Sequence, residues 1–386
     1  MSLRVMHVID SMIQGGAESL LLEHVRHAAP GTETTVVALN RGGPALEQAR
    51  ALGAHTELLG KGAARLAGLA RLASLMRARG IDAVNGHNPV GALYATAAAT
   101  WAGVPAIVRT EHSIHYAGRH SGVYPRLLEP LLTWRAGAVV CVCDAVRRSH
   151  ASRLRWADAK FVTIDNGISD APPSRARESL RATLELADAP VALTVGSLTP
   201  QKAQHVLLDA WTDVRRSLPG ARLLIAGAGA LEPVLRARAE RADLAGAVTF
   251  LGARQDVGDL LAAADVFVLS SVREGLSVTL LEAMRAARPV VATDIGGTAD
   301  VVDRGVTGHV VAPGAAAPLA AALVAVLADR DAAARMGAAG RARWEARYRA
   351  ERMVADTEAL YRRLLGRRAA AAEPPAAPRA AAGGTR

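Results

Sequence analysis

Short apolar strands alternate with amphipathic helices along most of the chain, and this alternation limits the fold more than any other feature. The opening run LRVMHVID is apolar, the glycine-rich SMIQGGAES follows it, and an amphipathic helix comes next. Later strand-like runs such as PAIVRTEHS and AGAVVCVCDAV end in polar residues. Alternation of this kind is typical of a parallel sheet with helices on both faces.

The pattern stops near the middle of the chain and then starts again. Residues 169–188 hold paired prolines and many polar residues, which favours a linker, and the alternation resumes at VALTVGSL. We therefore predict an α/β fold of two doubly wound, Rossmann-like domains, at 1–168 and 189–348, which face each other across a cleft. We expect a helix at 349–366 to pack back on the N-terminal domain, and a disordered tail at 367–386.

Composition argues against several functional classes. The net charge is +10, but the basic residues are scattered among acids and aromatic residues are few, so we expect no nucleic-acid partner. The two cysteines, Cys141 and Cys143, alternate along one predicted strand, and we expect packed thiols in a reducing compartment. No run reaches about 18 apolar residues, and the N-terminus lacks signal-peptide features, so we expect a cytoplasmic protein.

Candidate site residues follow the predicted strands. In doubly wound sheets, ligands bind beyond the carboxyl ends of the strands, and with two domains the cleft between them is the natural site. The polar and glycine-rich positions just after strands are Gly15, Gly16, His112, Ser197 to Lys202, Gly227 to Gly229, Glu274, Gly296 and Gly297.

The stretch REGLSVTLLEAM carries two glutamates with seven residues between them. Glu274 lies in a predicted loop, Ser277 is a plausible N-cap, and Glu282 lies in the second turn of the helix that follows. A helix N-terminus favours an anion such as phosphate, whereas carboxylates are good acceptors for neutral sugar hydroxyls. A ligand with a sugar at each end and phosphate between them would suit all three features, and a nucleotide sugar is such a ligand.

The chain resembles the retaining glycosyltransferases of GT-B fold, glycosyltransferase family 4. The E-x7-E motif of that family matches EGLSVTLLE, its N-terminal glycine loop matches GGAE, and its N-domain histidine matches TEHS. Its C-domain phosphate loop matches VGSLTPQKAQHVLLDA, while NGI and TDIGGTADVV also fit. The motifs occur in the expected order from residue 3 to about 365.

The resemblance implies a role for each matching residue. His112, Glu274 and Lys202 would be catalytic, with Lys202 neutralising the diphosphate as charge builds on it. Glu282 would hold the ribose. The remaining donor-binding positions would be Gly15, Gly16, Ser197, Arg254, Gly275, Leu276 and Ser277.

Two positions depart from the family pattern. The family often has arginine where this chain has Ser197, so Lys202 would carry more of the phosphate charge, or Arg254 or Arg273 would help. Ala203 stands where glycine is common. No metal and no cofactor are expected, since a lysine and a helix N-terminus can replace a cation in holding a diphosphate.

The implied reaction transfers a glycosyl unit from a nucleoside diphosphate sugar, UDP- or GDP-linked, to an acceptor hydroxyl with retention of configuration. Expected acceptors are lipid-linked saccharides or small molecules, in surface polysaccharide or glycolipid synthesis. Apolar and basic residues in YPRLLEPLLTWRAG and RRSHASRLRWADAK would form a peripheral membrane face, with a packed core as the alternative explanation. An inactive nucleotide-sugar-binding subunit and an epimerase on the same fold remain alternatives.

Overall fold

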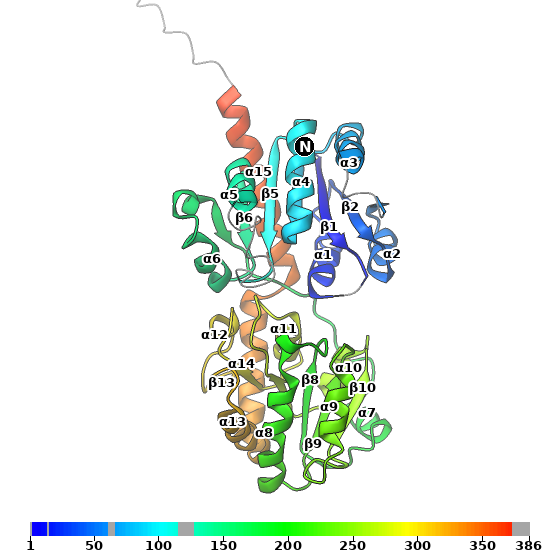
Figure 1. The fold of residues 1–386 in the computed structure, drawn as a ribbon, viewed down its shortest axis with the longest axis vertical. Coiled ribbons are helices and arrows are strands. Elements are labelled where there is room, and N and C mark those ends of the chain that lie inside the picture. The colour runs from blue at the N-terminus through cyan, green and yellow to red at the C-terminus, as the bar shows by residue number, and fades with distance from the viewer. Residues whose placement is uncertain (1, 14, 61–65, 115–126, 373–386) are drawn as a thin grey trace, which may run out of the picture.

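Two all-parallel sheets form the two domains of the protein (Figure 1). The computed structural model describes residues 2–13, 15–60, 66–114 and 127–372. The strands are β1 (Leu3–Ser11), β2 (Thr32–Arg41), β3 (His55–Leu58), β4 (Ala83–His87), β5 (Ala106–Glu111), β6 (Ala138–Cys141), β7 (Phe161–Thr163), β8 (Val191–Val195), β9 (Arg222–Ala226), β10 (Val248–Gly252), β11 (Val266–Leu269), β12 (Val290–Thr293) and β13 (Gly308–Val311).

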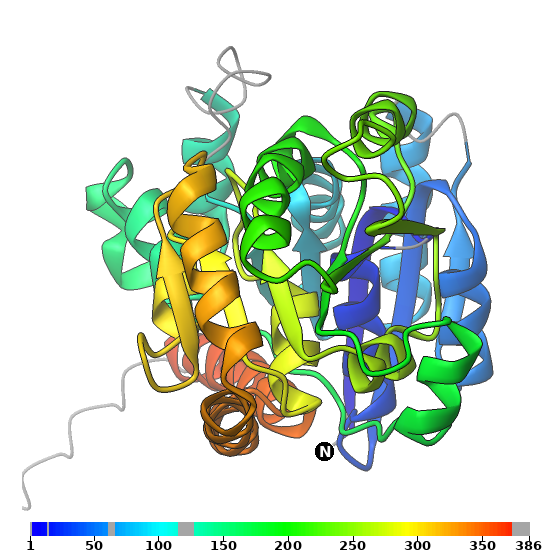
Figure 2. The same ribbon diagram turned by 90° about the horizontal axis from the view of Figure 1, so that it is seen from below.

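Helices connect nearly every strand to the next. They are α1 (Gly16–Arg26), α2 (Pro44–Ala51), α3 (Leu66–Ala78), α4 (Asn88–Ala102), α5 (Glu129–Arg135), α6 (Asp144–Ala151), η2 (Arg155–Lys160), α7 (Arg177–Thr183), η3 (Pro200–Lys202), α8 (Gln204–Ser217), α9 (Glu232–Ala239), α10 (Val257–Ala263), α11 (Val278–Arg285), α12 (Thr298–Val301), α13 (Ala316–Ala328), α14 (Arg330–Arg347) and α15 (Ala350–Ala372). The view from the C-terminal domain shows helices on both faces of the sheet (Figure 2).

Each sheet reverses its strand order once. The first runs β3-β2-β1-β4-β5-β6-β7 and the second runs β10-β9-β8-β11-β12-β13. Ligands of doubly wound sheets bind where the order reverses, which is beside β1 and β4 in one domain and beside β8 and β11 in the other. The predicted α/β class with two Rossmann-like domains is confirmed.

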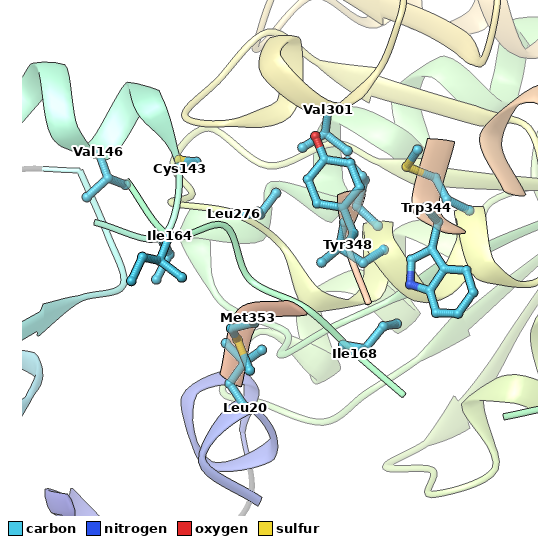
Figure 3. Packing of buried hydrophobic residues seen from close by; sticks show 14 of the residues in the cluster. Leu20, Cys143, Val146, Ile164, Ile168, Leu276, Val301, Trp344, Tyr348 and Met353 are labelled. Atoms are coloured by element: carbon cyan, nitrogen blue, oxygen red, sulfur yellow. The ribbon is translucent and has the colours of Figure 1, made fainter. Parts of the chain in front are cut away.

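A shared apolar cluster joins the two domains. It includes Leu20 of α1 and Val146 of α6 from the N-terminal domain, with Leu276 and Val301 from the C-terminal domain (Figure 3). Burial of apolar side chains from both sides stabilises this arrangement of the domains.

The chain crosses between the domains twice, and the two crossings are hydrogen-bonded to each other. The amide of Ile168 donates to the carbonyl of Tyr348 at 3.0 Å, and the amide of Ala350 donates to the carbonyl of Ile168 at 3.1 Å. After the second crossing, α15 lies against the N-terminal domain, where Asn85 of β4 donates to the hydroxyl of Tyr361 at 2.9 Å.

Two segments differ from the expectation. The proposed linker, 169–188, contains α7, which packs on α10 of the C-terminal domain because Leu180 and Leu186 are buried. The low-complexity tail begins as helix, because the alanine-rich sequence after residue 366 continues α15 to Ala372. Residues 373–386 lie outside the described part of the chain.

Candidate active site

A cleft of about 680 Å³ opens between the carboxyl ends of the two sheets. Both domains line it, and every residue with a predicted catalytic or donor-binding role borders it: Gly15, Gly16, His112, Ser197, Lys202, Arg254, Glu274, Gly275, Leu276, Ser277 and Glu282. Of the other candidate positions after strands, Gly229, Gly296 and Gly297 do not line it. The structure thus brings together residues that span 268 positions of the chain, from 15 to 282 counted inclusively.

Glu274 and Lys202 form an ion pair at the base of the cleft. Lys202, at the end of η3, lies 2.5 Å from Oε1 of Glu274, and the Ser271 hydroxyl donates to the same oxygen at 2.8 Å. Both side chains are largely buried. A buried ammonium needs a compensating anion, so Glu274 holds Lys202 in place.

The N-terminus of α11 faces the cleft without a side-chain cap. Ser277 has the extended backbone of an N-cap residue, as predicted, but its hydroxyl lies 3.0 Å from the Thr279 hydroxyl and makes no capping bond to the helix amides. The first turn of α11 therefore presents its amide groups and positive dipole end to a ligand.

Glu282 lies farther along α11, on the border of the cleft. Burial raises the pKa of its carboxyl, and the nearby Arg285 opposes that effect. Within the described residues this carboxylate makes no hydrogen bond, in contrast to that of Glu274. Its oxygens are available to accept from a ligand hydroxyl.

Two other arginines near the cleft are already engaged. Arg254 donates to both carboxylate oxygens of Asp256, at 2.8 and 2.6 Å, which raises the pKa of Arg254. Arg285 donates to the carbonyl of Ser169 at 2.9 Å. Ser197 is exposed at the cleft wall and brings no charge.

His112 follows β5 and lies opposite the glutamate loop. A Cβ atom on Gly275 would overlap the carbonyl oxygen of His112, so only glycine lets the loop come this close to the N-terminal domain. Burial lowers the pKa of His112 to about 4, so its imidazole is neutral near pH 7. Its Nε2 lies 3.0 Å from Nδ1 of His87.

The sequence assigned no role to two asparagines of the site. Asn88 and Asn166 line the cleft, and Asn166 donates to the carbonyl of Leu276 at 3.3 Å. Asn88 has a positive φ of 60°, a conformation that non-glycine residues adopt rarely and mostly at functional positions. The polar run NGHNP after a predicted strand was the available signal, but spacing alone could not place it at the cleft.

The cysteines and acidic groups define no further site. Cys141 and Cys143 are free and buried, and burial raises the pKa of the Cys143 thiol to about 11. Over the ranges that the structure describes, no group of three or more His, Cys, Asp or Glu side chains is arranged to hold a metal ion. The string DRD, Asp329 to Asp331, lies at the start of α14, where Asp329 accepts from the amide of Ala332.

Comparison with known proteins defines the class. The model of Glycosyltransferase Family 4 matches residues 14–171, and the model of Glycosyl transferases group 1 matches residues 189–329. The chain belongs to these glycosyltransferases.

Curated relatives carry several specific activities. A GDP-mannose-dependent α-(1-6)-phosphatidylinositol monomannoside mannosyltransferase of Mycobacterium tuberculosis is 35% identical over 193 residues, 48% of this chain and 50% of that protein. Glycogen synthase of the same species is 35% identical over 273 residues, 68% of this chain and 64% of that protein. This chain therefore spans about half to nearly two thirds of the length of these relatives.

Solved structures share the fold. Anabaena HepE in complex with UDP superposes with a TM-score of 0.79 at 22% identity, covering 93% of this chain and all of that one. A glycosyltransferase from Rickettsia africae superposes with a TM-score of 0.81 at 17% identity, over 94% and 99% of the two chains. At these identities the likeness concerns the fold alone, and it confirms the predicted GT-B architecture.

Proposed function

We propose that this protein transfers a hexosyl group from a UDP- or GDP-linked sugar to an acceptor hydroxyl, with retention of configuration. The observation that carries the proposal is the cleft, which joins an uncapped helix N-terminus, the Lys202–Glu274 pair and the free carboxylate of Glu282. These groups suit a ligand with a diphosphate between two sugars.

The donor would lie along α11. Its diphosphate would contact the amides of Gly275, Leu276 and Ser277, and Lys202 would compensate the charge that builds as the bond to the sugar breaks. Glu282 would accept from the ribose hydroxyls, and Glu274 from the transferred sugar. Gly15 and Gly16, at the start of α1, would let the backbone approach from the other side.

No residue in this arrangement is an obvious nucleophile, so the proposal follows the front-face displacement that the family resemblance implies. The leaving phosphate oxygen would take the acceptor proton on the face where the acceptor attacks. His112 would contact the transferred sugar or support developing charge. The lysine and the helix N-terminus together would make a metal ion unnecessary.

The relatives suggest the nucleotide and the pathway. The mycobacterial relative is named as GDP-mannose-dependent, and the Anabaena neighbour was solved with UDP and glucose. A role at the cytoplasmic side of surface polysaccharide or glycolipid synthesis fits both.

A peripheral membrane contact belongs to the same proposal. Leu127, Leu131 and Trp134 recur at helical spacing, and each is more than half exposed; Trp156 of η2 is exposed as well. We refer to these four residues as the membrane face. Leu132, which the sequence also suggested for this face, is buried in the core.

The basic residues beside the membrane face are mostly engaged. Lys160 donates to three carbonyls at the end of α5, Arg147 pairs with Asp158, and Arg148 pairs with Asp300. Apolar insertion rather than charge would therefore dominate binding to a lipid surface. We find no helix in the described ranges with the length and apolar character needed to cross a bilayer.

Vesicle cosedimentation tests the membrane face. The native protein should sediment with vesicles of phosphatidylcholine and phosphatidylglycerol, and Leu131→Glu with Trp134→Glu should abolish this. Trp101→Glu, at an exposed tryptophan of α4, serves as the control and should leave binding intact. Equal binding by all three proteins would contradict the assignment.

A thermal-shift panel tests the donor site. UDP, GDP and ADP, with their common sugars, are each added to the native chain and to Glu282→Ala. A ligand at 100 times its dissociation constant adds about 2.7 kcal/mol to the free energy of unfolding. One nucleotide should stabilise the native chain and not the variant, while the exposed Glu240→Ala control should behave as native.

An inactive donor-binding subunit is the second candidate, because Ser197 replaces an expected arginine and Arg254 is already paired with Asp256. Incubating the stabilising nucleotide sugar with the protein and following the anomeric signals by NMR separates the two. Release of the sugar as the same anomer supports the retaining enzyme. Binding without any turnover, unaffected by His112→Ala, supports the inactive subunit.

A further inference from the structure

Four histidines from separate elements meet beneath the cleft. His7 lies in β1, His24 in α1, His87 at the end of β4, and His112 just after β5. Nδ1 of His7 lies 2.9 Å from Nε2 of His87, and Nδ1 of His87 lies 3.0 Å from Nε2 of His112. The ring of His24 lies tilted against that of His7, with ring centroids 5.1 Å apart, and takes no part in this chain of hydrogen bonds.

The surroundings keep these rings uncharged. Burial lowers the pKa of His7 and His87 well below the ordinary value, and brings that of His24 and of His112 to about 4. The small space beside His24, His87 and His112 is lined by apolar, hydroxyl and amide side chains, with no carboxylate, lysine or arginine. Among the described residues that line this space, no charged group imposes a proton position on His87 or His112.

A neutral imidazole has one N–H and one bare nitrogen, which restricts how three linked rings can be protonated. If Nδ1 of His7 donates to His87, then His87 carries its proton on Nδ1 and donates to Nε2 of His112, which must carry its own proton on Nδ1. If His112 donates from Nε2, the direction reverses, and all three rings carry the proton on Nε2. Either way the three rings share one tautomer.

We propose that His87, with His7 behind it, is a positioning residue that sets the tautomer and the orientation of His112. The chain uses Nε2 of His112, so Nδ1 is the nitrogen left to meet a ligand in the cleft. The shared tautomer then decides whether His112 presents a donor or an acceptor there. This inference rests on the proposed function, because only a substrate in the cleft gives the orientation of His112 a use.

The first experiment needs no substrate. Long-range ¹H–¹⁵N correlation spectra of the full chain at pH 7 distinguish the protonated nitrogen from the bare nitrogen of each ring. His7, His87 and His112 should show the same tautomer. In His87→Phe, which keeps a ring and removes both nitrogens, His112 should change to a mixture. His24→Phe is the matched control and should leave the tautomer of His112 unchanged.

The second experiment measures release of sugar from UDP-glucose and GDP-mannose. His87→Phe should lower kcat by about 10- to 100-fold, the range found for outer partners of functional histidines at metal sites, with little change in KM. His87→Asn, which can still bond to Nε2 of His112, should lose less. His24→Phe should resemble the native protein.

The two experiments fail independently. If His112 and His87 show different tautomers, or if His87→Phe leaves both the spectrum of His112 and kcat unchanged, the inference is overturned. If neither sugar is turned over by the native protein, the spectra still decide whether the chain of histidines behaves as one unit.

Discussion

At the scale of single residues, the Lys202–Glu274 pair controls how the cleft takes up an anion. The two groups lie 2.5 Å apart and are largely buried, so a bound diphosphate must share Lys202 with Glu274. Removing Glu274 would leave a buried ammonium without a partner, which is costlier than removing both groups. Glu274 therefore stabilises the buried Lys202 when no ligand is bound, in addition to any contact that it makes with a sugar.

Restoring an arginine at position 197 should strengthen diphosphate binding. Ser197 is exposed on the cleft wall, and a charge-assisted hydrogen bond contributes about 1.5–3 kcal/mol, so Ser197→Arg should tighten UDP or GDP binding by about tenfold or more. Calorimetric titration measures it. Ser217→Arg, at the far end of α8, adds the same charge outside the cleft and should leave affinity unchanged. Equal effects of the two variants would mean that net charge alone is responsible.

Ala203 carries backbone strain that glycine would relieve. It has φ 48° and ψ 39°, in the left-handed region, which costs a residue with a Cβ about 1–2 kcal/mol. Glycine's greater freedom in the unfolded chain offsets part of this, so Ala203→Gly should raise the free energy of unfolding by about 0.5–1 kcal/mol. Urea titration checks the value. Ala210→Gly, in the interior of α8, should instead lower it by about 1 kcal/mol.

At the scale of elements, the paired crossings at Ile168 and Tyr348–Ala350 connect the two domains at one place beside the cleft. They let α15 begin beside the C-terminal domain and end on the N-terminal one (Figure 1). Because both connections lie at the same place, any rotation of one domain against the other must bend these two crossings.

Gly167→Ala should disturb this junction. A Cβ at Gly167 would overlap the carbonyl oxygen of Arg349, so the two crossings must separate. Overpacking of this kind costs about 1–3 kcal/mol, and we also expect a weaker apparent affinity for the nucleotide, since the cleft walls would shift. Gly220→Ala meets no atom within 4 Å and is the control. Native affinity together with native stability in Gly167→Ala would refute the idea.

At the scale of the whole molecule, the buried histidines couple stability to pH. Burial lowers the pKa of His24 from 6.5 in the unfolded chain to about 4 in the native protein, so between these values the unfolded chain binds a proton that the folded chain does not. The effect of His24 on the free energy of unfolding is therefore absent above about pH 6.5, and it lowers that free energy as the pH decreases toward about 4.

Replacing one of these histidines should reduce that loss. The His24→Phe variant takes up one proton fewer when it unfolds. Its free energy of unfolding should therefore fall less steeply than that of the native protein between pH 6 and 4.5, with a slope smaller by up to about 1.4 kcal/mol per pH unit. Urea titrations at several pH values give the slopes. His55→Asn, at an exposed histidine of β3, should retain the native slope. Parallel curves for the native protein and His24→Phe would contradict the assignment.

The amino-acid sequence by itself determined the architecture and most of the residues that line the site. Strand and helix periods are local, so the alternation, the restart after residue 188 and the helix start at Ser277 could be read directly. Polar residues after strands must gather at one edge of a parallel sheet, which is why the predicted site residues meet in one cleft.

Only the tertiary structure decided the partners of these residues. Part of the proposed linker forms α7, because Leu180 and Leu186 pack against the C-terminal domain and are buried there. The pairing of Lys202 with Glu274 and the line of His7, His87 and His112 depend on contacts between residues 25 to 80 positions apart. Sequence periodicity carries no information about such distances, since they are set by how the sheets and loops close on one another.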